Sequence, residues 1–201
     1  MKKSLILAAL GVAATAATSM GQGYVTFNSY SGNNLNGATA TLFNTSTLIG
    51  APYTAALYYE IGTFTDPVNN TDPTSITSLP GAGFTLYTGQ NPTAPLSGGY
   101  FTGGTMAIPG YTTGAITFEV VAYNGSSYTD TSSTFRGRSG AFTMASLPID
   151  TLSTVPLLGD NGQAMPNFFV AQVAAVPEPS TLALAGLGGF GMLMAFRRKK
   201  A

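Results

Sequence analysis

Two glutamates, Glu60 and Glu119, come nearest to a catalytic pair in this chain. Each lies in a segment where apolar and polar residues alternate, so each is expected on a β-strand. Two carboxylates that flank a glycosidic bond are sufficient to hydrolyse it. The alternative, which we favour, is that both are solvent-facing strand residues. The chain has no Trp to form a sugar-stacking platform, although its ten Tyr residues supply aromatic rings.

Two polar segments contain oxygen ligands of the kind that calcium prefers. Neither matches the spacing of an EF-hand loop, and Asp and Asn also occur in turns because their side chains bond to their own backbone. Turn chemistry is therefore the favoured interpretation of both, and no metal site is predicted. The segments contain Asp66, Asn69, Asn70 and Asp72, and Asp160, Asn161 and Gly162.

Arg136 and Arg138 alternate on one expected strand and so share a face. Two guanidinium groups on one face could bind a carboxylate or an anionic polysaccharide. They could equally form ion pairs with Glu119 or Asp130 across the sheet. The structural pairing is the interpretation that we favour.

Many catalytic classes are excluded by residues that the chain lacks. It has no Cys and no His, and no Lys lies between Lys3 and Lys199. These absences exclude thiolate nucleophiles and zinc sites built from Cys and His. They also exclude Ser-His-Asp and Ser-Lys catalysis. Residues 24–176 contain seven acidic and two basic residues, a charge of −5, which argues against nucleic-acid binding. We predict no catalytic residues, no cofactor and no enzyme activity.

The elements that must position these residues are strands. Residues 55–61 and 116–123 alternate most clearly, and Thr, Tyr, Phe and Val are frequent in the shorter runs, as is typical of strands. Turn residues separate the runs, with Asn124-Gly125 the best two-residue hairpin turn. The pattern predicts an all-β chain with one antiparallel sandwich or jelly-roll-like domain over residues 22–175. The shorter runs are 25–27, 38–43, 84–87, 100–108, 134–144 and 168–173.

The predicted core consists of the large apolar residues on these strands. The polar segments 64–78 and 147–163 are expected to be loops, and no helix is expected between the two ends of the chain. The core residues are Val25, Phe27, Leu42, Leu57, Ile61, Phe84, Leu86, Ile108, Ile116, Phe118, Val120, Phe135 and Phe142.

The first 21 residues have the three parts of a secretory signal peptide. Lys2 and Lys3 give a positive start, residues 5–14 are apolar, and small residues follow. The apolar part is too short for a membrane span. Cleavage could follow Ala16, Ser19 or Gly21, and we favour Gly21, which would leave Gln22 as the first residue. Export through the Sec translocon is expected.

The last 26 residues, 176–201, have a different three-part order. Pro177, Glu178 and Pro179 come first, and the uncharged stretch 180–196 follows. Seventeen helical residues span roughly 25 Å, a short but feasible membrane helix if the basic side chains reach toward the interface. Basic residues stay on the cytoplasmic side, so the β domain is expected outside. They are Arg197, Arg198, Lys199 and Lys200.

This order of a Pro-Glu-Pro motif, a short apolar helix and a basic cluster resembles the PEP-CTERM sorting signal of exported bacterial proteins. The resemblance implies an exosortase partner that acts near Pro177, Glu178 and Pro179, which serve as recognition residues. It also implies a Gram-negative bacterium that makes exopolysaccharide, a further expected partner. The membrane would hold the protein in transit, before it reaches the cell surface or extracellular matrix.

Three functions follow in order of preference. The first is an exported, non-enzymatic surface or matrix protein. The second is a glycan-binding module, which requires several tyrosines, such as Tyr58, Tyr87 and Tyr100, on one exposed face. The third is a secreted hydrolase that uses two carboxylates.

Overall fold

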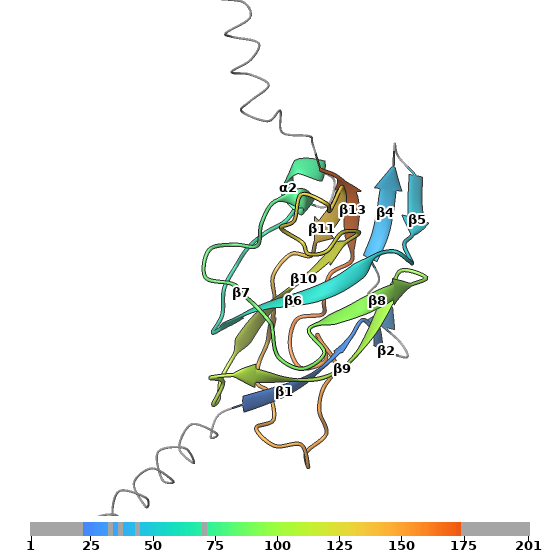
Figure 1. Cartoon of the computed structure of the whole chain (residues 1–201). Coiled ribbons are helices and arrows are strands. Elements are labelled where there is room, and N and C mark those ends of the chain that lie inside the picture. Colours follow the sequence, from blue (N-terminus) through green and yellow to red (C-terminus); the bar gives the residue numbers. More distant parts are fainter. Residues whose placement is uncertain (1–21, 32–33, 36–37, 43–44, 70–71, 174–201) are drawn as a thin grey trace, which may run out of the picture.

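The structure is a computed structural model that describes residues 22–173 except 32–33, 36–37, 43–44 and 70–71. Nearly all regular structure in these residues is β-strand, which confirms the all-β class (Figure 1). The elements are β1 (Gln22–Asn28), β2 (Tyr30–Ser31), β3 (Asn34–Leu35), β4 (Ala38–Leu42), β5 (Thr45–Leu48), β6 (Thr54–Ile61), α2 (Pro73–Thr77), β7 (Thr85–Leu86), β8 (Thr93–Ser97), β9 (Tyr100–Pro109), β10 (Ile116–Tyr123), β11 (Phe135–Arg138), β12 (Phe142–Met144) and β13 (Phe168–Gln172).

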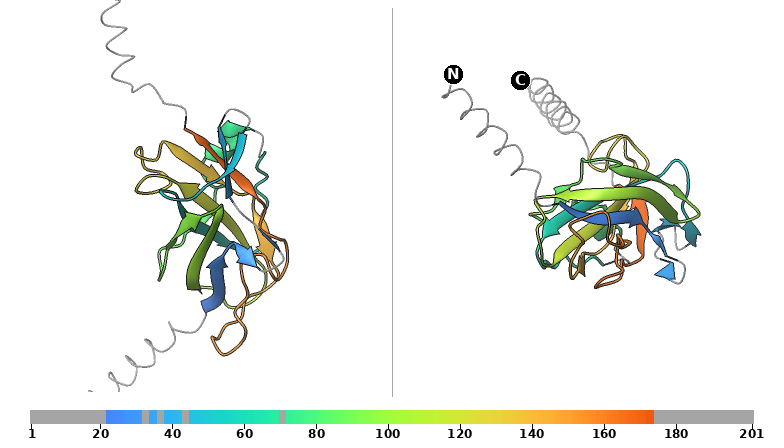
Figure 2. Two further views of the ribbon diagram at one scale, coloured as in Figure 1. Left: turned by 90° about the vertical axis from the view of Figure 1, so that its right-hand side faces the viewer. Right: turned by 90° about the horizontal axis from the view of Figure 1, so that it is seen from below.

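Eleven of these strands belong to one hydrogen-bonded sheet, in the order β1-β9-β8-β6-β10-β11-β13-β4-β5, with β12 attached to β10 and β7 to β6. All of its pairings are antiparallel except β13 with β4. The sheet is strongly twisted, with β1 and β9 at one end of the molecule and β4 and β5 at another (Figures 1 and 2). Strand pairing thus connects these strands into one continuous sheet. The sandwich or jelly-roll arrangement remains a prediction.

The centre of the sheet is the antiparallel pair β6 and β10, which stay in register over eight residue pairs from Thr54–Tyr123 to Ile61–Ile116. Every residue of β10 is buried. Alternation of apolar and polar residues is typical of a strand with one face in solvent, so the burial of β10 on both faces requires other parts of the chain to cover the second face. The second face of β10 is covered by the chain between β6 and β8, which includes α2 and β7, and by the loop 124–134.

Two apolar clusters therefore lie on opposite faces of β6 and β10. The larger cluster contains Val25, Phe27, Leu57, Phe101, Met106, Ile108, Ile116, Phe118, Val120, Phe142 and Phe168, among others. The smaller cluster contains Ala56, Tyr58, Val121, Tyr123 and Tyr128, with Phe84 packed against it.

The predicted core is confirmed at eight positions: Val25, Phe27, Leu57, Ile108, Ile116, Phe118, Val120 and Phe142. It is wrong at Ile61, at the end of β6, and at Leu86, on the two-residue strand β7, which are 42% and 39% exposed. Phe84 and Phe135 are half-buried, and the side chain of Leu42 lies outside the described residues.

The predicted turn at Asn124-Gly125 is wrong. Residues 124–134 form a long loop, closed where Asn124 N donates to Phe135 O at 3.2 Å and Phe135 N donates to Asn124 Oδ1 at 2.9 Å. The single run expected over 134–144 is split into β11 and β12. Ser139 causes the break, because its N–H and hydroxyl bond to the backbone of Val120 at 2.8 and 2.9 Å.

The structure adds a five-residue helix, α2, that the apolar pattern does not predict. Asp72 caps it by accepting a hydrogen bond from Thr74 N at 2.8 Å, and Pro73 occupies the first turn. Both are favoured at helix starts. Five residues are too few to show a helical stripe, so only these terminal signals could have indicated the helix.

None of the helices in the described residues is long and apolar enough for a membrane crossing. The predicted signal peptide, 1–21, and the predicted membrane helix, about 180–196, lie outside those residues.

Candidate functional site

Glu119 is fully buried, which corrects the expectation that it faces solvent. It lies on the β10 face that the second cluster covers, opposite Tyr58 in the strand register. The signal was present in the sequence, since Val121 and Tyr123 share this nominally polar face of β10. Because Glu119 has no exposed surface, Glu60 and Glu119 do not form the open carboxylate pair that glycoside hydrolysis needs.

Glu119 instead belongs to a buried ionic cluster centred on Arg138. Arg138 Nη1 donates to Glu119 Oε2 at 3.0 Å and to Asp66 Oδ2 at 2.8 Å. Its Nε and Nη2 donate to Ser78 Oγ at 3.2 and 3.0 Å. Arg138 thereby joins β10 and β11 to both ends of the segment 66–78. The predicted ion pair between Arg138 and Glu119 is confirmed.

The two carboxyl groups of the cluster have opposite pKa shifts. Burial, together with a hydrogen bond to Asp66, raises the pKa of Glu119 to about 8, although Arg138 opposes the rise. Burial would raise the pKa of Asp66 also, but hydrogen bonds from Glu119 and Arg138 outweigh it and hold that pKa below its usual range. These opposite pKa shifts favour a protonated Glu119 beside an ionised Asp66.

Arg136 has a different role from the predicted cross-strand ion pair. Its Nε donates to Thr77 O at 2.9 Å and its Nη1 to Tyr128 O at 2.8 Å. Tyr128 donates its hydroxyl to Ile76 O at 3.0 Å and to Ser78 O at 2.7 Å. Three carbonyls that the end of α2 leaves without helical donors are satisfied in this way. The suggested partner Asp130 instead accepts from Ser132 N at 2.7 Å within its own loop.

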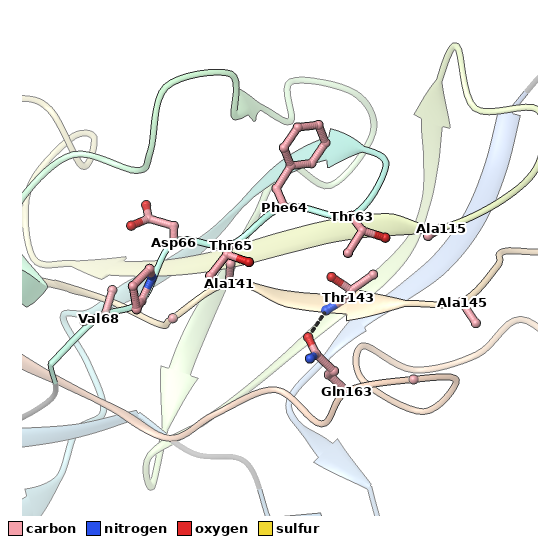
Figure 3. A pocket seen from close by; sticks show the side chains of 13 residues that line it. Thr63, Phe64, Thr65, Asp66, Val68, Ala115, Ala141, Thr143, Ala145 and Gln163 are labelled. Atoms are coloured by element: carbon pink, nitrogen blue, oxygen red, sulfur yellow. Dashed lines mark hydrogen bonds between the residues drawn. The ribbon is translucent and has the colours of Figure 1, made fainter.

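A wide cleft of about 660 Å³ opens beside Asp66, between the chain after β6 and the strand β12 (Figure 3). Threonine side chains line it, together with Phe64, which is 39% exposed, and Gln163. Gln163 Oε1 accepts from Thr143 N at 2.9 Å. Among the described residues that line the cleft, Asp66 is the only acidic one, and its carboxylate is engaged by Arg138. The described lining of the cleft therefore contains no second carboxylate to pair with Asp66.

In the two candidate calcium segments, the carboxylates of the acidic residues bind to other groups of the protein. Asp66 pairs with Arg138, Asp72 caps α2, and Asp160 accepts from Leu157 N at 2.9 Å. The part of the chain that the structure describes contains no group of three or more potential ligands placed to hold a metal ion. Asn70 lies outside it.

The tyrosines named for a glycan-binding face do not form one. Tyr58 and Tyr87 are buried, and Tyr100 lies half-buried on β9. Three tyrosines do gather elsewhere, since Tyr58, Tyr123 and Tyr128 line one cavity over β6, the end of β10 and the loop 124–134.

The sorting segment begins just past β13, the last described strand, and its residues lie outside the described part. In one class of exported proteins, the sorting signal is a C-terminal segment that follows the folded domain and is separate from it. Residues 175–199 match the family model of the PEP-CTERM protein-sorting motif. The chain therefore carries a PEP-CTERM protein-sorting motif, which supports export and processing by an exosortase.

The match contains the predicted recognition residues Pro177, Glu178 and Pro179, whose individual roles remain predictions. It also contains Arg197, Arg198 and Lys199, and ends one residue before Lys200. No curated protein and no solved structure matches the chain.

Proposed function

We propose that this protein is a non-enzymatic component of the cell surface or extracellular matrix. The match of residues 175–199 to the sorting motif is the observation that carries the proposal. In the proposed route, the signal peptide 1–21 directs the chain to the Sec translocon. The helix at about 180–196 then holds it in the membrane, with Arg197–Lys200 on the cytoplasmic side. An exosortase acts near Pro177–Pro179 and releases the β domain.

The composition and burial of the domain support a structural role. The chain lacks His and Cys, and Glu119, one of its two best catalytic candidates, is buried in the cluster around Arg138. Residues 24–176 carry only nine charges. A sparsely charged surface rich in hydroxyl and amide groups suits close packing in a matrix, since few like charges keep neighbouring molecules apart. In this proposal the domain is a sandwich-like body that packs beside exopolysaccharide.

Terminal mass spectrometry on the native protein, after membrane and matrix are separated, tests the route. Protein from the matrix is expected to start near Gln22 and to end near residues 177–180. A variant with Ala at Pro177, Glu178 and Pro179 should remain in the membrane with Arg197–Ala201 intact. The matched control, Pro109→Ala, changes an exposed proline at the end of β9 and should be processed normally. Intact Arg197–Ala201 on the wild-type protein in the membrane would show a permanent anchor and overturn the exosortase step.

A further inference from the structure

Residues 149–155, here called the projecting loop, stand out from the end of the molecule where β1 begins. In Figures 1 and 2 the loop is the orange segment that extends past β1. It carries Ile149 and Leu152, which are 61% and 97% exposed, the two most exposed large apolar side chains among the described residues. Single exposed apolar residues are common, but two gathered on one projection indicate a surface that meets a partner.

Both ends of the projecting loop are held on β1. Tyr24 N donates to Pro148 O at 2.9 Å, and Thr26 N donates to Pro156 O at 2.8 Å. Thr26 O in turn accepts from Leu158 N at 3.2 Å. The two prolines restrict the backbone where the loop leaves the domain and where it returns. The loop therefore projects from two fixed points.

The tip of the projecting loop is ordered by Asp150. Its Oδ1 accepts from Leu152 N at 3.0 Å and from Ser153 N at 2.7 Å. The same hydrogen bonds, that from Ser153 above all, hold the pKa of Asp150 below its usual range, so the carboxylate is ionised at neutral pH. A leucine that is held in water by an ordered backbone gains free energy when it enters an apolar phase.

The shape of the projecting loop favours lipid over a protein partner. A specific protein interface buries about 800 Å² on each partner, over a broad surface of matching shape. Here two apolar side chains stand on a narrow projection, and a bilayer can accept them without a preformed pocket. The other exposed residues beside Leu152 are small and carry hydroxyl groups, as the headgroup region tolerates: Thr151, Ser153 and Thr154.

The position of the loop also places it near a membrane during export. Gln22 and Thr151 line one groove of about 520 Å³, so the loop lies beside the residue that follows the predicted signal peptide. A signal peptide is inserted in the membrane while the chain is exported. This step of the argument rests on the proposed function.

We propose that the projecting loop inserts Leu152, with Ile149 beside it, into the surface of a zwitterionic lipid bilayer. The hydroxyl groups of the loop and the carboxylate of Asp150 remain at the level of the headgroups, because burying a charge in hydrocarbon is costly. The negative charge of Asp150 disfavours an anionic surface. Two side chains give only weak, reversible attachment, so the loop acts together with the membrane segments proposed for the chain ends.

Fluorescence quenching from the lipid side and from the water side tests the proposal. The chain has no Cys, so Thr151→Cys gives a single site for an NBD label next to Leu152. The labelled full chain is reconstituted in phosphatidylcholine vesicles, with a nitroxide on the acyl chains as the lipid quencher and iodide as the water quencher. Thr131→Cys is the matched label control, because it is an exposed threonine of the loop 124–134, where the structure describes no exposed large apolar side chain.

The label at position 151 should be quenched by the nitroxide lipid and protected from iodide, and the label at position 131 should show the reverse. With the label at position 151, Leu152→Ser should lower the ratio of inserted to free loop about tenfold or more, the effect of one leucine that remains in water. Leu79→Ser removes a leucine that is 57% exposed elsewhere and should change nothing. Circular dichroism on every variant establishes that the fold is retained.

Three results would overturn the proposal. The first is a label at position 151 that iodide reaches and the nitroxide lipid does not. The second is protection from iodide without lipid quenching, which would indicate contact with a second copy of the chain or with another protein. The third is lipid quenching that Leu152→Ser leaves unchanged. None of these results depends on cleavage of the chain ends, so the proposed sorting route can hold or fail separately.

Discussion

Glu119→Gln tests whether the buried carboxyl at the centre of the ionic cluster is neutral. Glutamine has the shape of a protonated glutamate, and its amide oxygen can accept from Arg138 as Glu119 Oε2 does. If Glu119 is protonated in the folded protein, the substitution should change the free energy of unfolding by less than about 1 kcal/mol at pH 6. If Glu119 is an ionised partner of Arg138, breaking the buried pair should cost about 3–5 kcal/mol.

The pH dependence of stability gives a second measure of the same group. The pKa of Glu119 rises from an ordinary value near 4.5 to about 8 on folding. Between these values the folded chain binds one more proton than the unfolded chain, so stability falls as pH rises. The slope is about 1.4 kcal/mol per pH unit, or roughly 2–3 kcal/mol from pH 5.5 to 7.5. For a chain of this size that is a fall in Tm of about 5–10 °C.

Thermal unfolding by circular dichroism at pH 5.5, 6.5 and 7.5 measures this slope. The wild type should lose stability across the window, and Glu119→Gln should remove most of the loss. Asp130→Asn is the control, because hydrogen bonds from Ser132 and Ser126 hold the pKa of this exposed carboxyl below its usual range, outside the window. A wild type whose Tm is constant or rises from pH 5.5 to 7.5, with a Gln variant weakened at every pH, would refute a neutral Glu119.

Tyr128→Phe should lower the free energy of unfolding by about 1–3 kcal/mol, because two carbonyls at the end of α2 lose their donor; denaturant unfolding measures it. Gly137→Ala should prevent recovery of folded protein, because the new Cβ would overlap Phe169 O on the neighbouring strand; soluble yield in exported fractions reports it. Phe27→Ala should cost about 3–5 kcal/mol, since the side chain is fully buried against another ring, and a cost below 1 kcal/mol would contradict the assigned core.

Local patterns in the sequence predict the strands at the centre of the sheet and the sorting segment well. The strands β6 and β10 follow from alternation, because the face toward the larger cluster is consistently apolar. The sorting segment follows from charge and hydropathy in a fixed order, with no need for tertiary information. The strand β8 is missed because Pro95 lies in its middle, and a proline argues against an inner strand.

The candidate sites are missed for a different reason. Which face of β10 is covered depends on how the chain between β6 and β8 folds back over the sheet. That path depends on contacts distant in the sequence, so Glu119 and Tyr58 are expected at the surface and are buried instead. The local signal was limited to Val121 and Tyr123, which share the face of Glu119 on β10. The pair of Arg138 and Glu119 is predicted because it is a cross-strand contact of neighbouring strands, whereas Asp66 joins it from 72 residues away.

The strand β13 is the last described strand in the chain, yet it lies between β11 and β4 in the sheet (Figure 1). A chain exported from its N-terminus presents β4 and β11 long before Phe168–Gln172 emerges. Until then, two strand edges remain open to pairing with other chains. The sorting match begins three residues after β13, at residue 175. We therefore expect the sheet to close at nearly the same time as the sorting segment reaches the membrane. The exosortase would then act on a domain that has just finished folding.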